Sequence, residues 1–252
     1  MTRIADALRH APPLPVDAVL ADVRTALAER GTAVLVAPPG AGKTTRVPLA
    51  LLEAPWVGSG RLLVLEPRRL AARAAATQLA RLLGEAPGET VGYRVRHDTR
   101  VGPRTRIEVV TEGILTRMLQ DDPTLEGIAG VCFDEFHERH LTTDLGLALA
   151  LETRGLVRPD LRLLVMSATL EPAPVAALLG DALLGEAPVI VSEGRAFPVE
   201  VRWRGEGADR AVFEEEVGRA DRLHATQGPQ EVVQSREQLA ALLDGIGPCE
   251  AL

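Results

Sequence analysis

Several residue types are scarce or missing, and each absence excludes a class of protein. The chain of 252 residues contains no asparagine, so it has no Asn-x-Ser/Thr site for N-glycosylation. Its two cysteines, Cys132 and Cys249, lie too far apart in sequence for a CxxC metal site or a disulfide scaffold. No run approaches the roughly 18 apolar residues of a transmembrane helix, and residues 1–20 lack the apolar core of a signal peptide. We therefore expect a cytoplasmic protein that does not enter a membrane.

Aromatic residues make up only 3% of the chain, whereas 46% of its residues are hydrophobic. The core must therefore consist mainly of leucine, valine and alanine. A chain of this length and apolar content can form one sizeable core, with room for little more than a fragment of a second.

The net charge of −7 argues at first against a nucleic-acid partner. The charge is uneven, however, because residues 205–252 contain ten acidic residues and four arginines. The remaining 204 residues are close to neutral and include a basic segment in which Asp98 is the only acid among five arginines: Arg94, Arg96, Arg100, Arg104 and Arg106. Local basic patches matter more for nucleic-acid binding than the global sum. This segment is either a contact surface or a solvated loop.

Lysine is almost absent: Lys43 is the only lysine among 28 basic residues. It lies in Ala37-Pro38-Pro39-Gly40-Ala41-Gly42-Lys43-Thr44-Thr45, between a predicted strand and a predicted helix. Glycines let backbone N–H groups approach phosphates, and a compact ammonium fits between β- and γ-phosphates where a planar guanidinium does not. The loop departs from the strict phosphate-loop pattern because Ala37 occupies its first glycine position. The alternative is a glycine-rich turn with an incidental lysine.

Apolar runs alternate with helical patterns along the chain. Strands are predicted at 32–37, 61–66, 106–110, 127–133, 161–166, 189–192 and 198–202, and helices at 16–29, from about 42, 68–83, 112–119 and 143–153. This alternation predicts an α/β fold with a mostly parallel sheet and helices on both faces. Five polar segments directly follow strands and should line one edge of the sheet: Ala37–Thr45, Pro67–Arg69, Thr111–Gly113, Asp134–His137 and Ser167–Thr169.

Two adjacent acids, Asp134 and Glu135, follow the strand Val131-Cys132-Phe133. On their own they indicate no more than a solvated strand end. About 90 residues after the glycine loop, however, they fit a Walker B pair, in which one carboxylate holds Mg²⁺ and the next activates the attacking water. The second acid favours hydrolysis of a nucleotide over transfer of its phosphate to a small molecule.

The five segments together resemble the superfamily 2 helicases of the DEAH/RHA group. Their order is the same, and Phe136 at the third position of Asp134-Glu135-Phe136-His137 is typical of a bacterial branch of that group. The resemblance covers about residues 1–203 and implies a RecA-like P-loop NTPase domain over residues 1–204. Residues 205–252 would be an acidic tail, either a linker or the incomplete start of a second domain.

The resemblance also implies a role for individual residues. Pro39, Gly40, Ala41, Gly42, Lys43, Thr44 and Thr45 would bind ATP, Thr44 and Asp134 would hold Mg²⁺, and Glu135 would be the catalytic base beside Asp134 and Lys43. His137, Ser167 and Thr169 would couple ATP hydrolysis to strand movement. Arg68, Arg69, Arg96 and Thr111 would touch the backbone of single-stranded RNA or DNA.

Simpler interpretations of some of these residues remain open. Arg68 and Arg69 could only solvate the start of a helix, and Ser167 and Thr169 could form a helix N-cap. The two histidines His97 and His140 are expected to be solvated.

The chain contains no Gln-x-x-Gly-Arg-x-Gly-Arg motif, which the resemblance places on a second RecA-like domain. Arginines of this kind accelerate phosphoryl transfer by about 10³–10⁵ in related enzymes. We therefore expect this chain to bind ATP·Mg²⁺ and to hydrolyse it slowly at best without that domain. We also expect it to be a monomer. The alternatives are another P-loop ATPase or kinase, and a nucleotide-binding fragment with no hydrolysis of its own.

Overall fold

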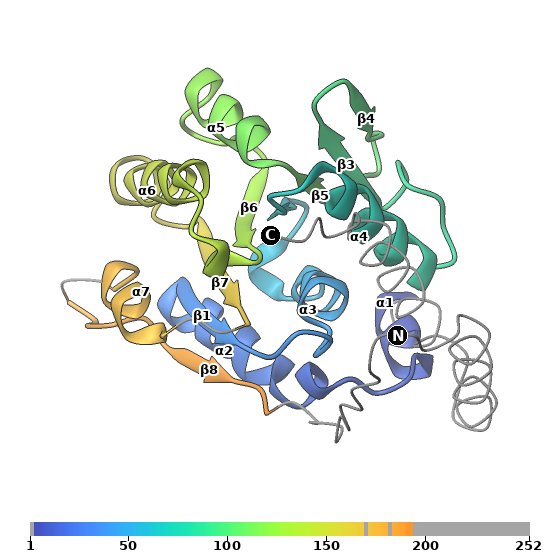
Figure 1. Ribbon diagram of the computed structural model, residues 1–252, viewed down its shortest axis with the longest axis horizontal. Helices are drawn as coiled ribbons and strands as arrows, with labels where there is room; N and C mark the ends of the chain where they lie inside the picture. Colours follow the sequence, from blue (N-terminus) through green and yellow to red (C-terminus); the bar gives the residue numbers. More distant parts are fainter. Residues whose placement is uncertain (1–2, 169–170, 181–182, 194–252) are drawn as a thin grey trace, which may run out of the picture. The chain divides into compact units, whose positions relative to one another are not determined.

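The computed structural model describes residues 3–168, 171–180 and 183–193, which form one mixed α/β unit (Figure 1). Eight strands make a single sheet in the order β4-β3-β5-β2-β6-β7-β1-β8 within these residues. The strands are β1 (Thr32–Val36), β2 (Arg61–Leu65), β3 (Val91–Val95), β4 (Asp98–Arg100), β5 (Ile107–Val110), β6 (Ile128–Phe133), β7 (Arg162–Ser167) and β8 (Val189–Val191). Every pairing is parallel except that of β3 with β4.

Helices cover both faces of the sheet, as the alternating pattern predicts. The α-helices are α1 (Arg3–His10), α2 (Leu20–Arg30), α3 (Lys43–Leu52), α4 (Arg69–Leu82), α5 (Glu112–Asp121), α6 (Leu141–Leu156) and α7 (Pro172–Leu178), with short 3₁₀ turns η1 (Pro15–Val19), η2 (Pro55–Val57) and η3 (Phe136–Glu138). Figure 1 shows α5, α6 and α7 on one side of the strands and α3 and α4 on the other. Two apolar cores result, one under α2, α3 and α4 and one under α5, α6 and α7.

The two cores follow from alternation along the central strands. In β6, Cys132 belongs to the core beneath α3, whereas its neighbours Val131 and Phe133 belong to the core beneath α5 and α6. A strand buried on both faces reads as a continuous apolar run, because both of its side-chain rows need apolar partners. The RecA-like α/β class predicted from sequence is therefore confirmed in its architecture.

Most predicted elements are present, and the differences lie at the edges. The helix α1, the hairpin β3–β4 and the helix α7 are present but were not among the predicted elements. The predicted strand at 198–202 and the acidic segment 205–252 lie outside the described residues. Among the described residues, no helix combines the length and apolar character needed to cross a membrane.

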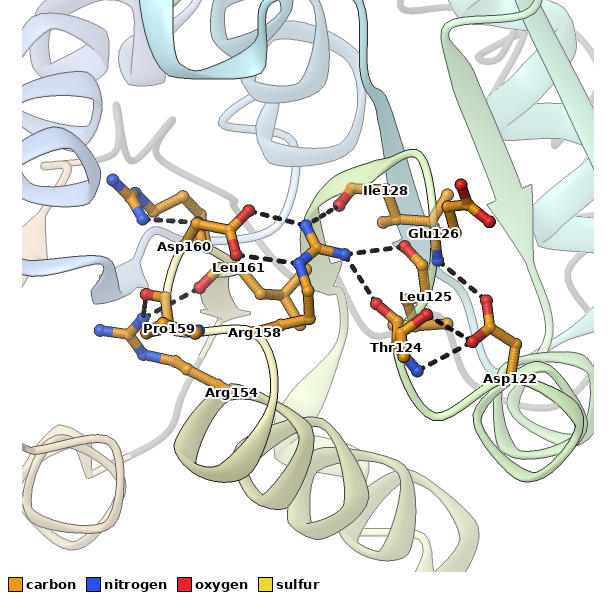
Figure 2. A network of polar contacts seen from close by, with 11 residues as sticks. Asp122, Thr124, Leu125, Glu126, Ile128, Arg154, Arg158, Pro159, Asp160 and Leu161 are labelled. Atoms are coloured by element: carbon orange, nitrogen blue, oxygen red, sulfur yellow. Dashed lines mark hydrogen bonds and ion pairs between the residues drawn. The ribbon is translucent and has the colours of Figure 1, made fainter.

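A polar network braces the amino ends of β6 and β7 (Figure 2). The Arg158 guanidinium donates hydrogen bonds to the carbonyls of Thr124 (2.6 Å), Leu125 (3.0 Å) and Ile128 (2.9 Å), and it pairs with Asp160 at 2.8 Å. This one side chain satisfies three carbonyls of the loop that enters β6. The network therefore lies at the amino ends of these strands, whereas the candidate site forms at their carboxyl ends.

Candidate nucleotide site and strand-contact residues

The glycine loop joins the end of β1 to the start of α3 and depends on two left-handed glycines. Gly40 and Gly42 have φ angles of 75° and 93°, a region that side chains with a Cβ rarely adopt. A Cβ on Gly42 would also lie 2.6 Å from Cδ1 of Leu14. The loop therefore needs glycine at Gly42 for both backbone conformation and space.

The segment before α2 packs directly on this loop, which the sequence did not indicate. The Val16 amide donates to the carbonyl of Ala41 at 3.0 Å. From α3, the buried Arg46 guanidinium donates to the carbonyl of Pro12 at 2.5 Å and lies 3.7 Å from a carboxylate oxygen of Asp17. The N-terminal segment and the first turns of α3 thus hold the phosphate loop from two sides.

Lys43 is the first residue of α3 and is only 4% exposed. Its ammonium donates to the carbonyl oxygens of Ala37 (2.7 Å) and Pro38 (3.2 Å), both within the loop. The only lysine of the chain therefore sits inside the glycine loop with its charge directed at loop oxygens. Pro39 and Thr45 also lie here, and the Thr45 hydroxyl donates to the carbonyl of Gly42 at 3.4 Å.

Asp134 lies at the carboxyl end of β6 and is fully buried. Its Oδ2 accepts a hydrogen bond from the hydroxyl of Thr44, and its Oδ1 accepts one from the backbone N–H of Glu135 at 2.9 Å. Thr44 and Asp134 are 90 residues apart in sequence. The structure therefore brings together the two residues predicted to hold Mg²⁺.

Burial raises the pKa of Asp134 to about 6, an effect that the hydrogen bond from Thr44 opposes and the charge of Glu135 increases. A second buried carboxyl, Glu66 at the end of β2, has a pKa raised to about 8 by its burial and by the charges of Asp134, Glu135 and Glu138, with Arg68 opposing. Glu66 was not among the predicted site residues. The only feature of the sequence that could have indicated Glu66 is its position as an acidic residue directly after the apolar run of β2.

The donor set around Asp134 fits Mg²⁺. Carboxylate and hydroxyl oxygens are the hard ligands that Mg²⁺ prefers, and it usually takes one or two from the protein and the rest from phosphates and water. Among the described residues, no group of three or more His, Cys, Asp or Glu side chains could hold a metal alone.

Glu135 and His137 follow Asp134 in a tight turn. Glu135 adopts a left-handed conformation with φ of 49°, which is uncommon for a residue other than glycine. Nδ1 of His137 lies 3.3 Å from a carboxylate oxygen of Glu135. Strained backbone at such a position is typical of functional sites. The turn begins directly after Asp134, whose carboxylate accepts the amide of Glu135.

Ser167 ends β7, the strand that lies between β1 and β6. It is fully buried, and its carbonyl accepts a hydrogen bond from the Ala37 amide at 3.0 Å. Ser167 is therefore joined to the start of the glycine loop. Thr169, predicted to act with it, lies outside the described residues.

The four predicted nucleic-acid residues differ in exposure. Arg68 and Arg69 are exposed at the start of α4, and Arg96 is exposed between β3 and β4. Thr111, the N-cap of α5, is only 8% exposed. Arg68 pairs with Glu138, whereas Arg69 and Arg96 have no polar partner among the described residues.

The basic segment between 94 and 106 is less open than its sequence indicates. Arg94 pairs with the buried Glu108 at 2.7 Å, Arg104 pairs with Glu89 at 3.1 Å, and Arg106 donates to the carbonyls of Gly58 (2.7 Å) and Gly60 (2.9 Å). Only Arg96 and Arg100 of the five stay exposed without a polar partner in the part of the chain that the structure describes.

His140 is exposed, as expected, but it also has a partner that the sequence did not indicate. Its imidazole Nδ1 lies 3.0 Å from a carboxylate oxygen of Glu112, and the side chain is 46% exposed. The sequence could not show this contact, because Glu112 and His140 belong to the starts of two different helices, α5 and α6.

The sheet, the glycine loop after β1 and the acidic pair after β6 define a RecA-like P-loop domain. The family model for DEAD/DEAH box helicases matches residues 21–178, which is more than half of the chain. The chain belongs to the DEAD/DEAH box helicase family.

The individual relatives include bacterial helicases, in agreement with the bacterial branch of the DEAH/RHA group that Phe136 indicated. The chain is 55% identical over 190 residues to the "ATP-dependent RNA helicase HrpB" of Escherichia coli K12, and 35% identical over 193 residues to its "ATP-dependent RNA helicase HrpA". The crystal structure of the E. coli DEAH/RHA helicase HrpB matches 93% of the chain with a TM-score of 0.69 and 47% identity. The predicted family is thereby confirmed.

These relatives are much longer than the matched region. The HrpB match takes in 75% of this chain but 23% of HrpB, and the HrpA match takes in 76% of this chain but 14% of HrpA. The crystal structure of HrpB matches 93% of this chain over 30% of its own chain. The chain therefore spans about a quarter of the HrpB polypeptide or less than a fifth of HrpA.

Proposed function

We propose that this chain is the ATP-binding domain of an ATP-dependent nucleic-acid helicase and that it contacts single-stranded RNA. The observation that carries the proposal is the hydrogen bond from Thr44 to Asp134, beside a buried Lys43. It joins the start of α3 to the end of β6 at the point where a P-loop enzyme needs its phosphate-binding and metal-binding groups together. RNA is favoured because the relatives are named RNA helicases.

The residues of the loop have separate roles in binding. On nucleotide binding, the Lys43 ammonium would leave the carbonyls of Ala37 and Pro38 and donate to phosphate oxygens instead. Its positive charge would then neutralise part of the phosphate charge. Backbone N–H donors would come from Gly40, Ala41, Gly42 and the N-terminal end of α3, whereas Pro39, which has no N–H, would shape the loop, and Thr45 would support it through Gly42. Thr44 and Asp134 would hold Mg²⁺, which supplies charge neutralisation at the β- and γ-phosphates.

Glu135 is the proposed general base for the attacking water. The carboxylate of Asp134 is fully buried and accepts hydrogen bonds from Thr44 and from the Glu135 amide. It is therefore placed to hold a cation beside Thr44, whereas it is poorly placed to take a proton from a solvent-accessible water. The next carboxylate, Glu135, is about one-third exposed and can reach a water molecule. His137 and Ser167, with Thr169, would transmit the state of the nucleotide to the strand-contact residues Arg68, Arg69, Arg96 and Thr111.

The test compares binding of a fluorescent ATP analogue and ATP turnover with and without single-stranded RNA, and with DNA of the same sequence. Lys43→Ala should abolish nucleotide binding, and Glu135→Gln should retain binding but lose turnover. Thr77→Val, on the exposed face of α4, is the control and should match the wild type in both.

Unchanged nucleotide binding in Lys43→Ala would refute the proposed site. Tight binding without turnover, even with RNA, would assign this chain a nucleotide-binding role alone. Equal stimulation by DNA and RNA would remove the assignment of RNA.

A further inference from the structure

His140 lies between two carboxylates that come from different segments. Its Nδ1 is 3.0 Å from Oε1 of Glu112, and its Nε2 is 3.6 Å from Oε2 of Glu138. Glu112 is the first residue of α5, directly after Thr111, and Glu138 ends the turn that begins at Glu135. A single imidazole therefore connects the start of α5 with the turn that carries the proposed catalytic base.

The Glu138 side extends this connection to α4. Oε1 of Glu138 pairs with the Arg68 guanidinium, and Arg68 is the N-cap of α4. Oε2 of Glu138 is buried and receives no hydrogen bond within the described residues, so the imidazole at 3.6 Å is the polar group placed to compensate it. The order Arg68–Glu138–His140–Glu112 thus runs from the start of α4 to the start of α5.

The Glu112 side is well fixed. The hydroxyls of Thr142 and Thr143, in the first turn of α6, both donate to the Glu112 carboxylate. Burial alone would raise the pKa of Glu112, but the bonds from these hydroxyls and from His140 outweigh it and lower the pKa. Glu112 is therefore a charged acceptor held at the interface of α5 and α6.

The main chain of His140 fixes the direction of its ring. His140 is the N-cap of α6, and its carbonyl accepts hydrogen bonds from the amides of Thr143 and Asp144, each at 3.0 Å. Its neighbour Arg139 is left-handed and pairs with Asp144 through two bonds of 3.0 and 3.2 Å. The ring is nearly half exposed and is not part of either apolar core, so its contacts with the carboxylates are its main interactions.

We propose that His140 is a positioning residue that holds Arg68 and Thr111, the strand-contact residues at the starts of α4 and α5, in a fixed relation to the turn of Glu135 and His137. The inference rests on the proposed function, because it assumes that Arg68 contacts the strand. Without the imidazole, the buried oxygen of Glu138 loses the polar ring that lies 3.6 Å from it, and Glu112 loses one of its three hydrogen-bond partners. Arg68 then loses the rigid support of its carboxylate partner, and strand affinity falls.

The experiment measures the affinity of the full 252-residue chain for a fluorescein-labelled single-stranded RNA, with a saturating non-hydrolysable ATP analogue and Mg²⁺. His140→Ala should weaken RNA binding about threefold to tenfold, as expected for loss of one partly exposed hydrogen bond. Affinity for the nucleotide should stay within about twofold. His140→Gln, which keeps an N–H donor that can reach Glu138, should recover part of the RNA affinity.

His10→Ala is the matched control, because His10 also bonds through Nδ1, to the carbonyl of Asp6 at 2.7 Å, but lies on α1. It should bind RNA like the wild type. The decisive comparison repeats His140→Ala in an Arg68→Ala background. If His140 acts through Arg68, the second substitution should cause little further loss.

Each other outcome overturns the inference. Unchanged RNA affinity in His140→Ala, an equal loss with and without Arg68, or a parallel loss of nucleotide affinity would each show that His140 does not position Arg68. If the wild-type chain binds the nucleotide but not RNA, the strand-binding part of the proposed function fails, and the inference falls with it.

Discussion

The hydroxyl of Thr44 donates a hydrogen bond to Oδ2 of Asp134, and so joins the first turn of α3 to the end of β6. The strands β1 and β6 that lead to these residues are not neighbours, because β7 lies between them. The contact therefore depends on the glycine loop, which carries α3 back across the edge of the sheet. The two residues proposed to hold Mg²⁺ are therefore already in contact within the protein itself.

Thr44→Val should separate the metal-dependent part of nucleotide binding from the rest. Valine keeps the shape of threonine but has no oxygen for the cation or for Asp134. Nucleotide affinity should fall roughly tenfold with Mg²⁺ and change little in EDTA. The contact of Thr44 with the cation contributes to nucleotide binding only when the cation is present, whereas its hydrogen bond to Asp134 is lost with and without nucleotide. Fluorescence titration with both buffers measures this, and Thr77→Val on α4 is the control. An equal loss in both buffers would contradict a role in metal binding.

Lys43→Arg tests whether the loop requires the only lysine of the chain. The ammonium is almost fully buried and lies on two loop carbonyls, which leaves no room for a planar guanidinium in the same place. We expect the affinity for ATP to fall by at least about tenfold, although the positive charge is conserved. Calorimetric titration measures the affinity, and a thermal unfolding midpoint near that of the wild type shows that the variant is folded. Affinity within twofold would refute the requirement.

The elements that were predictable from sequence are those whose pattern is local. The strand β6 reads as an apolar run because both of its faces are buried, and Asp134 stands out because it ends that run. The hairpin β3–β4 lacks such a pattern, since Arg94 and Asp98 interrupt it and find their partners on other elements.

The contacts that sequence could not reveal depend on neighbours in space. The contact between His140 and Glu112 arises only when the fold brings the starts of α5 and α6 together. The raised pKa of Glu66 arises only when the fold buries its carboxyl and places Asp134 near it. The N-terminal segment is similar, because only the folded chain shows Val16 bonded to Ala41 in the phosphate loop.

The buried carboxyl of Glu66 should make stability depend on pH. Its pKa is raised from an ordinary value of 4.5 to about 8, first by burial and then by Asp134 and its acidic neighbours. Between these values the folded state holds a proton that the unfolded state has lost, so its contribution to stability is greatest below about pH 4.5 and is lost as the pH rises through about 8. The slope is at most about 1.4 kcal/mol per pH unit.

Glu66→Gln removes this titration while keeping the shape of the side chain. Relative to the wild type, the variant should gain stability as the pH is raised from about 5.5 to about 8. Urea unfolding in EDTA at both pH values measures the change. Glu89→Gln, a partly exposed carboxylate near the hairpin, should leave the wild-type pH profile unaltered. A constant difference between Glu66→Gln and the wild type would show that Glu66 does not titrate in this range.

Glu108 should be the most important acidic residue for stability. It is fully buried in β5, and its two carboxylate oxygens pair with Arg61 on β2 at 2.5 Å and with Arg94 on β3 at 2.7 Å. One carboxylate therefore links three adjacent strands. Removing one member of a buried pair leaves the others uncompensated, although both arginines here reach solvent in part. Glu108→Ala should lower the free energy of unfolding by about 2–4 kcal/mol.

The matched comparison is Glu89→Ala, which breaks the exposed pair with Arg104 in the same region of the sheet. Exposed pairs contribute little, so its cost should stay below about 1 kcal/mol. Urea unfolding of both variants at neutral pH separates the two cases. Similar losses in the two variants would mean that Glu108 acts only as a surface charge. A large loss in Glu108→Ala alone would show that the pairs of Glu108 with Arg61 and Arg94 hold the three strands together.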